Sequence, residues 1–150
     1  MNKQHQVVLS LGSNQGNRLE NIERCIISIH REIGTVIKVS RLFETPAWGF
    51  ESEPFYNCAV VVHTHKSAHQ VLDEVLLLEE ALGRIRSDVE GYQARIIDID
   101  VISFDEEIIA SEKLKVPHPE MQNRLFVLLP VNDLKSDFFH PTLNKNITSF

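Results

Sequence analysis

Residues 83–104 read GRIRSDVEGYQARIIDIDVISF, and the rest of the chain can be interpreted around them. The second half, 95–104, is rich in β-branched residues and predicts a strand. Because side chains alternate along a strand, Asp98 and Asp100 should share one face, while the apolar residues between and beside them face a core. Two carboxylates this close repel each other, and a divalent cation such as Mg²⁺ relieves that conflict.

The same stretch carries Arg84, Arg86 and Arg95. A guanidinium group matches phosphate oxygens in shape and charge, so three of them beside a carboxylate pair suit a polyphosphate. Our central hypothesis is a Mg²⁺–nucleotide site. The alternative is a polar strand face at the edge of a sheet, with the arginines as surface counterions, since short motifs also match by chance.

Composition limits the class of protein. A chain of 150 residues with 43% hydrophobic and 24% charged residues is typical of one globular domain, and we expect a single domain over 1–150. The formal charge of −6 argues against a general nucleic-acid binder. We find neither an apolar run of about 20 residues, as a membrane helix needs, nor a signal peptide. Cys25 and Cys58 form no metal or redox motif. We therefore expect a cytoplasmic protein with no nucleic-acid or membrane partner.

The order of the predicted elements indicates the fold class. Apolar residues recur at steps of three and four in two segments, which predicts helices, and four other segments read as strands. Asn17 resembles a helix N-cap, and Gly34 a C-cap. The order is strand, helix, strand, strand, helix, strand, which predicts an α+β, ferredoxin-like βαββαβ core. We expect a largely antiparallel sheet with helices on its faces and a C-terminal extension over 105–150. The predicted strands are 7–11, 36–43, 55–64 and 95–104, and the predicted helices are 17–33 and 67–82.

Two loops offer further candidate groups. Trp48 and Phe55 suit stacking on a flat heterocycle, and the Asn57 amide suits hydrogen bonding to its edge. Trp48 could equally anchor its own loop to the core. The prolines around His118 fix a rigid loop that places His118 and Arg124 near a phosphate, or that serves packing alone. GSNQGN at 12–17 lacks the signature of a phosphate loop, and we interpret it as structural.

Taken together, these motifs resemble a known family, the 6-hydroxymethyl-7,8-dihydropterin pyrophosphokinases of folate biosynthesis. The resemblance covers most of the chain, in order and at fitting spacings. It is carried by LGSN (11–14), LFETPAWG (42–49), FYNCAV (55–60), LEEALGRIR (78–86), RIIDIDVI (95–102) and VPHPEMQNRLF (116–126).

The resemblance implies an enzyme that transfers the diphosphoryl group of ATP to the hydroxymethyl oxygen of the reduced pterin and releases AMP. It implies two Mg²⁺ ions held by Asp98 and Asp100, with Arg84 and Arg95 as catalytic arginines. The implied nucleotide-binding residues are Glu79, Arg84, Arg86, Tyr92, Arg95, His118 and Arg124. The implied pterin-binding residues are Thr45, Pro46, Ala47, Gly49, Phe55, Asn57 and Phe126, with Phe55 and Phe126 as stacking planes.

One departure and two alternatives remain. Residues 92–95 read Tyr-Gln-Ala-Arg where the family usually has an aromatic residue followed by Gly-Pro-Arg, which leaves the conformation of this loop open. Another Mg²⁺-dependent phosphoryl or nucleotidyl transferase, or a module that binds a nucleotide without turnover, would share the same fold. We name no general base, and we expect a monomer, with a homodimer left open.

Overall fold

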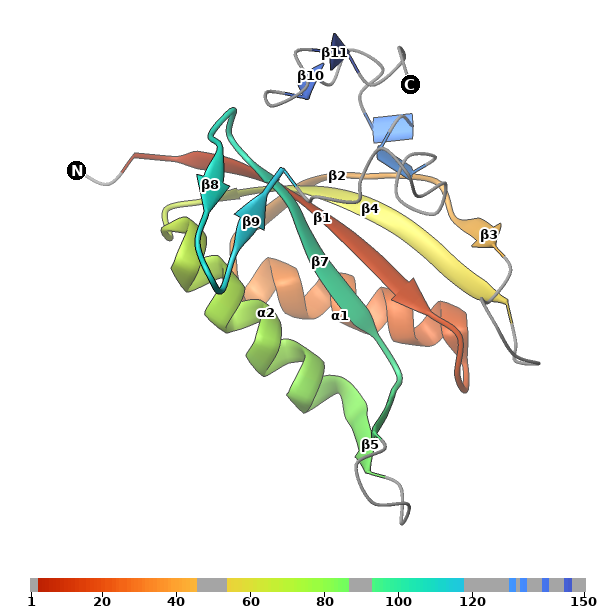
Figure 1. Cartoon of the computed structure of the whole chain (residues 1–150). Coiled ribbons are helices and arrows are strands. Elements are labelled where there is room, and N and C mark those ends of the chain that lie inside the picture. Colours follow the sequence, from red (N-terminus) through yellow and green to blue (C-terminus); the bar gives the residue numbers. More distant parts are fainter. Residues whose placement is uncertain are drawn as a thin grey trace.

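An antiparallel sheet in the order β2–β4–β1–β7 forms the centre of the molecule (Figure 1). Its strands are β1 (His5–Ser13), β2 (Thr35–Val39), β4 (Phe55–Thr64) and β7 (Asp98–Phe104), and β3 (Phe43–Thr45) pairs with the beginning of β4. This computed structural model describes residues 3–45, 54–86, 93–117, 130–131, 133–134, 139–140 and 145–146. For residues 84–86, 93–95, 139–140 and 145–146 the description covers the backbone.

Helices α1 (Arg18–Glu32) and α2 (Ala68–Gly83) both cover the same face of this sheet (Figure 1). The β1–α1–β2 and β4–α2–β7 connections begin at strands β1 and β4, which are antiparallel neighbours, and lead toward opposite edges of the sheet. If both connections are right-handed, as such crossovers are, both helices lie on the same face of the sheet. The ferredoxin-like prediction is confirmed. Three short hairpins complete the described elements: β5 (Arg84–Arg86) with β6 (Gln93–Arg95), β8 (Ile109–Ala110) with β9 (Lys115–Val116), and β10 (Phe139–His140) with β11 (Lys145–Asn146).

The main core lies between the sheet and the helices. Helix α1 begins at the predicted cap, where the side chain of Asn17 accepts the N–H of Glu20 at 3.1 Å. Its buried residues are Ile22, Cys25 and Ile29, while Leu19 in its first turn is 49% exposed. The core is built from alternate residues of β1, β4 and β7 and from one stripe of each helix: Val7, Leu9, Leu11, Ile22, Cys25, Ile29, Cys58, Val60, Val62, Val71, Val75, Leu78, Ile97, Ile99 and Val101.

Both cysteines are free thiols inside this core, as expected of reduced residues. Burial raises the pKa of the Cys58 thiol to about 12. Burial likewise raises the pKa of Cys25, and the nearby Cys58 and Glu79 add to the effect. At neutral pH both are neutral thiols that act as small apolar side chains.

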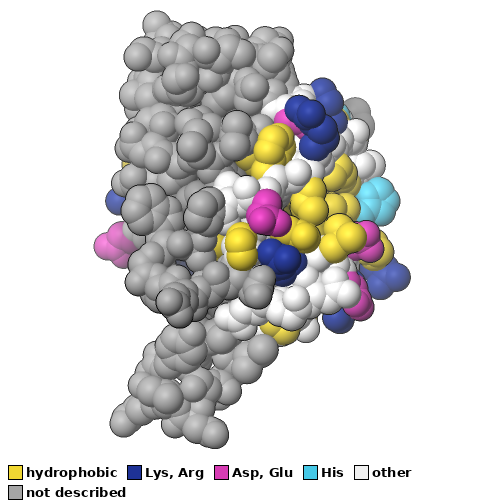
Figure 2. Space-filling view, turned by 90° about the vertical axis from the view of Figure 1, so that its right-hand side faces the viewer, with side chains coloured by type: hydrophobic (Ala, Val, Ile, Leu, Met, Phe, Trp, Pro, Cys, Tyr) yellow, Lys and Arg dark blue, Asp and Glu magenta, His cyan; other side chains and the backbone are white. Residues whose placement is uncertain are grey.

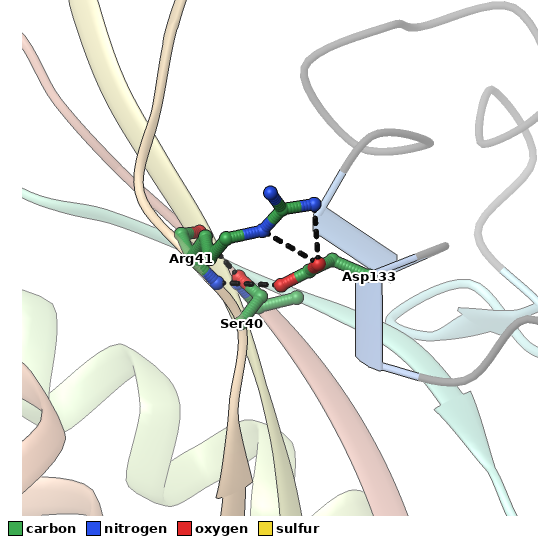
Figure 3. A network of polar contacts seen from close by, with 4 residues as sticks. Ser40, Arg41 and Asp133 are labelled. Carbon is green, nitrogen blue, oxygen red and sulfur yellow. Dashed lines mark hydrogen bonds and ion pairs between the residues drawn. The ribbon is translucent and has the colours of Figure 1, made fainter.

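A second, smaller core lies on the face that the helices leave open. Val131 and Leu134 from the C-terminal extension pack there with residues of β1, β4 and β7, namely Val8, Ala59, Val61 and Ile102. Figure 3 shows the polar contact that fastens this segment: the Nε of Arg41 donates to Asp133 Oδ1 at 2.8 Å, and the backbone N–H of Arg41 donates to Asp133 Oδ2 at 2.7 Å. Val131, Asp133 and Leu134 are therefore part of the packed fold.

Gly34 follows α1, as predicted, but its role there differs. Its N–H donates to Ile29 O at 3.2 Å, and its backbone is outside the left-handed region that a glycine C-cap adopts. A Cβ at this position would lie 2.2 Å from the carbonyl oxygen of His63. Glycine is required here because the helix end passes against strand β4.

Two predicted strands are each divided in the structure. The predicted strand 36–43 is β2 and β3, separated at Ser40, whose Oγ accepts the N–H of Ala59 at 2.8 Å. The predicted strand 95–104 is β6 and β7, separated at residues 96–97. The bend at 96–97 lets the first part pair with β5 while the second pairs with β1.

The described surface is mixed in character. On the described part of the face in Figure 2, hydrophobic, basic and acidic side chains lie among one another, so neither sign of charge dominates it. Among the helices that the structure describes, none is long and apolar enough to cross a membrane.

Candidate active site

The two aspartates of β7 lie on the helix-free face of the sheet. Ile97, Ile99 and Val101 are buried in the core on the helix side, and Ile102 belongs to the cluster on the opposite face. Asp98 and Asp100 alternate with these residues and are half-buried, as predicted. Strand β7, the last strand in the order of the described sheet, thus presents two carboxylates on one face.

Small residues lie beside these aspartates on β1. The register pairs Asp98 with Gly12 and Asp100 with Ser10. Gly12 in turn pairs with Asn57 on β4. A Cβ on Gly12 would lie 3.2 Å from the Oδ1 of Asn57, so even alanine would crowd this row. Glycine at this position therefore leaves the close packing between β1 and the Asn57 side chain undisturbed.

Three of the predicted pterin-binding residues, Thr45, Phe55 and Asn57, lie together at the β4 end of the row that runs from Asp98 through Gly12. Asn57 is only 2% exposed, and its Nδ2 donates to Thr45 Oγ1 at 2.7 Å. Phe55 pairs with Thr45 across β3 and β4. We had expected the Asn57 amide to supply both donor and acceptor to a ligand, whereas in the structure its donor group also holds Thr45 in place. With strands about 4.8 Å apart, Asn57 lies roughly 10 Å from Asp98, two strands away.

The arginines form a hairpin that runs directly into the aspartate strand. The backbone register sets Arg84 opposite Arg95, and Arg86 opposite Gln93. The sequence predicted a polyphosphate at these arginines, and the structure adds that their backbone positions lie on two paired strands, Arg84–Arg86 and Gln93–Arg95, that lead into the aspartate strand.

The base of this hairpin is fixed by a network that sequence reasoning missed. Ile96 lies between β6 and β7, and its N–H donates to Gly83 O at 3.3 Å. Its carbonyl accepts the Oγ–H of Ser13 at 2.6 Å. Asn21 of α1 donates to Ser13 Oγ at 3.1 Å and to Gln15 O at 2.8 Å. The sequence signal was the GSNQGN segment, which we interpreted as structural and which here contributes Ser13 and Gln15 to the network that holds the hairpin.

Gly83 has a second part in this junction. Its φ of +128° is accessible to glycine, and a Cβ there would lie 2.6 Å from the Cδ1 of Ile96. Helix α2 can therefore turn into β5 without displacing Ile96. The hairpin and the aspartate strand are thus joined at a defined angle.

A cavity of about 360 Å³ lies on the outer side of β7, beside Asp100. Its apolar walls include Leu72 and Leu76, and Glu79 and Lys113 also line it. Leu76 of α2 is half exposed, because it faces this cavity. The cavity combines apolar walls with charged groups, as a nucleoside site requires.

Among the described residues, no group of three or more histidine, cysteine or acidic side chains is arranged to hold a metal. Asp98 and Asp100 fit an ion such as Mg²⁺, which takes one or two carboxylates and completes its shell with water and phosphate oxygens. Seven of the predicted site residues lie outside the described residues: Pro46, Ala47, Gly49, Tyr92, His118, Arg124 and Phe126.

Comparison with known proteins agrees with this arrangement. The family model described as 7,8-dihydro-6-hydroxymethylpterin-pyrophosphokinase matches residues 8–136. A 2-amino-4-hydroxy-6-hydroxymethyldihydropteridine pyrophosphokinase of Porphyromonas gingivalis is 35% identical over 138 residues, which is 90% of this chain and 93% of the relative. The folic acid synthesis protein fol1 of Pneumocystis carinii is 38% identical over 96% of this chain, but the chain spans only 19% of that protein.

Solved structures agree on the fold. A crystal structure of wild-type Plasmodium falciparum HPPK-DHPS superposes with a TM-score of 0.77 at 19% identity, covering 99% of this chain and 44% of the other. Since the identity is low, this likeness concerns the fold alone. The sequence matches show the family as well as the fold: the chain belongs to the 7,8-dihydro-6-hydroxymethylpterin-pyrophosphokinase family.

Proposed function

We propose that this chain transfers the diphosphoryl group of ATP to the hydroxymethyl oxygen of 6-hydroxymethyl-7,8-dihydropterin and releases AMP, a step of folate biosynthesis. Family membership and a relative of similar length named for this activity support the proposal. One observation of the structure supports it: the strand with two carboxylates on one face follows, after residues 96–97, a hairpin whose backbone register pairs Arg84 with Arg95.

Asp98 and Asp100 are proposed to hold two Mg²⁺ ions together with the phosphate oxygens. When bound, Mg²⁺ neutralises phosphate charge and lowers the pKa of a coordinated hydroxyl. Arg84 and Arg95 are proposed to stabilise charge on the moving diphosphoryl group, with Arg86, His118 and Arg124 on the nucleotide. Such a transfer needs alignment and charge stabilisation more than covalent catalysis, so the two charged elements are sufficient for its chemistry.

The two substrates are assigned to opposite sides of the aspartate strand. The cavity lined by Leu72, Leu76 and Glu79 is proposed to take the nucleoside part of ATP. The pterin is assigned to the row that ends at Asn57 and Phe55, together with Thr45 and with Pro46, Ala47, Gly49 and Phe126. Gly12, which has no side chain, lies between Asp98 and Asn57 in the strand register, which supports a transfer between the two sides.

Product analysis tests the proposal. The protein is incubated with ATP, Mg²⁺ and the reduced pterin alcohol, and nucleotides are separated by chromatography. We expect AMP in equal amount with the pterin diphosphate. Formation of ADP would indicate transfer of a single phosphoryl group, and no consumption of ATP would indicate a binding module; either result contradicts the proposal.

A further inference from the structure

The carboxylate of Glu79 is buried between α2 and β7, directly behind the aspartate pair. Glu79 is 5% exposed, and its Oε2 accepts the backbone N–H of Ile99 at 3.0 Å. Ile99 is the residue between Asp98 and Asp100. The Glu79 carboxylate, on the helix side of the sheet, is thus hydrogen-bonded to the backbone of the residue that lies between the two aspartates.

The position of β7 explains why this N–H needs a side-chain acceptor. In the described sheet, β1 lies on one side of β7, and the other side faces α2. In an antiparallel pair, alternate residues turn their N–H groups toward the partner strand and the rest turn outward. The N–H of Ile99 is turned outward, where a buried donor must find a partner. Glu79 meets this need with an acceptor that is stronger than a neutral oxygen when ionised.

Glu79 does not belong to the carboxylate cluster itself. Ile99 is buried in the helix-side core, whereas the aspartates alternate with it and lie on the opposite face. No third acidic side chain joins Asp98 and Asp100 in a metal-binding group within the described ranges. The contact that links Glu79 to the aspartates along the chain is its hydrogen bond to the backbone of Ile99.

We infer that Glu79 is a positioning residue, which fixes the backbone between Asp98 and Asp100 and so sets the spacing and direction of both carboxylates toward the divalent cation. The metal part of this inference rests on the proposed function, while the Ile99 contact stands on its own. Because Glu79 also lines the cavity assigned to the nucleoside, it connects the nucleotide side of β7 to the metal side.

The test uses four variants and two readouts that need no turnover. Glu79→Gln keeps an acceptor oxygen, Glu79→Asp keeps the charge but withdraws it by one methylene, and Glu79→Leu removes the acceptor. Glu80→Gln, at the exposed neighbouring position, is the matched control. The readouts are hydrogen exchange of the Ile99 amide by NMR, and the affinity for Mn²⁺ with a non-hydrolysable ATP analogue. Mn²⁺ replaces Mg²⁺ here because it accepts the same oxygen ligands and broadens nearby resonances.

We expect the Ile99 amide to be protected in the wild type, in Glu80→Gln and in Glu79→Gln, with Mn²⁺ affinities within about threefold of one another. Glu79→Leu and Glu79→Asp should expose this amide and weaken Mn²⁺ binding by about tenfold to a hundredfold, as loss of a group that orients metal ligands does. A group that merely joined helix to sheet would lower thermal stability without changing the metal affinity of the folded fraction.

Two results would overturn the inference. One is rapid exchange of the Ile99 amide in the wild type, which needs no variant to fold. The other is wild-type Mn²⁺ affinity in Glu79→Asp, the variant that keeps the charge and withdraws only the acceptor. Failure to form AMP would refute the proposed function and leave both readouts in place, so the two failures are distinguishable.

Discussion

Replacing Ser13 by alanine should disturb the arginine hairpin without touching any substrate. The Ser13 hydroxyl is 1% exposed; it donates to Ile96 O at 2.6 Å and accepts from Asn21 at 3.1 Å. The substitution leaves the Ile96 carbonyl without this donor, while Asn21 keeps its bond to Gln15 O. A buried polar group deprived of its partner costs about 1–3 kcal/mol, so we expect a loss of about 2 kcal/mol in the free energy of unfolding.

The effect on catalysis should exceed what stability explains. Ile96 joins the hairpin to the aspartate strand, and a misplacement of about 1 Å near a reacting group can reduce the rate by about a hundredfold. We expect kcat/KM to fall by between about tenfold and a hundredfold in Ser13→Ala. The control is Asn17→Ala, which removes the N-cap bond to Glu20 and costs about 1 kcal/mol but leaves the Ser13 donor to Ile96 O in place.

Both variants are measured by urea unfolding and by steady-state AMP formation, under conditions in which each is folded. Ser13→Ala should lose activity, and Asn17→Ala should keep it within about twofold, since a helix cap contributes stability alone. Equal kcat/KM values in the two variants would refute the claim that Ser13 positions the hairpin.

Three further predictions concern separate parts of the chain. Arg95→Ala should reduce turnover at least about a hundredfold, as expected for one charge-stabilising group, with little change in urea unfolding; near-wild-type turnover would show the role to be wrong. Gly34→Ala should lower the free energy of unfolding by about 3 kcal/mol, because its Cβ meets His63 O at 2.2 Å; an unchanged urea midpoint would contradict this contact. Hydrogen bonds from the Arg41 backbone and side chain hold the pKa of Asp133 below its ordinary value. The stability contributed by this carboxylate is therefore complete above about pH 4 and is lost as the pH falls through the lowered pKa. The difference in unfolding free energy between wild type and Asp133→Asn, measured with urea, should be larger at pH 7 than at pH 2. The same difference at both pH values would contradict this role of Asp133.

Regular patterns along the chain were sufficient for much of the fold. Strand β4 has the bounds that its apolar run predicted, 55–64. The alternation of acids and aliphatic residues in β7 placed Asp98 and Asp100 on one face, because a period of two leaves no other arrangement when one face is buried. Asn17 is the N-cap of α1, as its amide side chain indicated.

Features that depend on contacts between distant segments were not predictable in this way. The division of 95–104 into two strands depends on the bond from Ser13 to Ile96, a separation of 83 residues. The strand at Arg84–Arg86 exists because it pairs with β6, and its own residues carry no strong strand signal. Gly34 was assigned to a helix end by its type, whereas its close approach to β4 is a tertiary contact.

The carboxylate pair on β7 can be examined most directly in a crystal structure with Mg²⁺ and a non-hydrolysable ATP analogue. Our account predicts that Asp98 and Asp100 both coordinate magnesium that also binds the phosphates, with Arg84 and Arg95 around the same triphosphate. Magnesium and nucleotide bound with those two carboxylates turned away from the ion would contradict it.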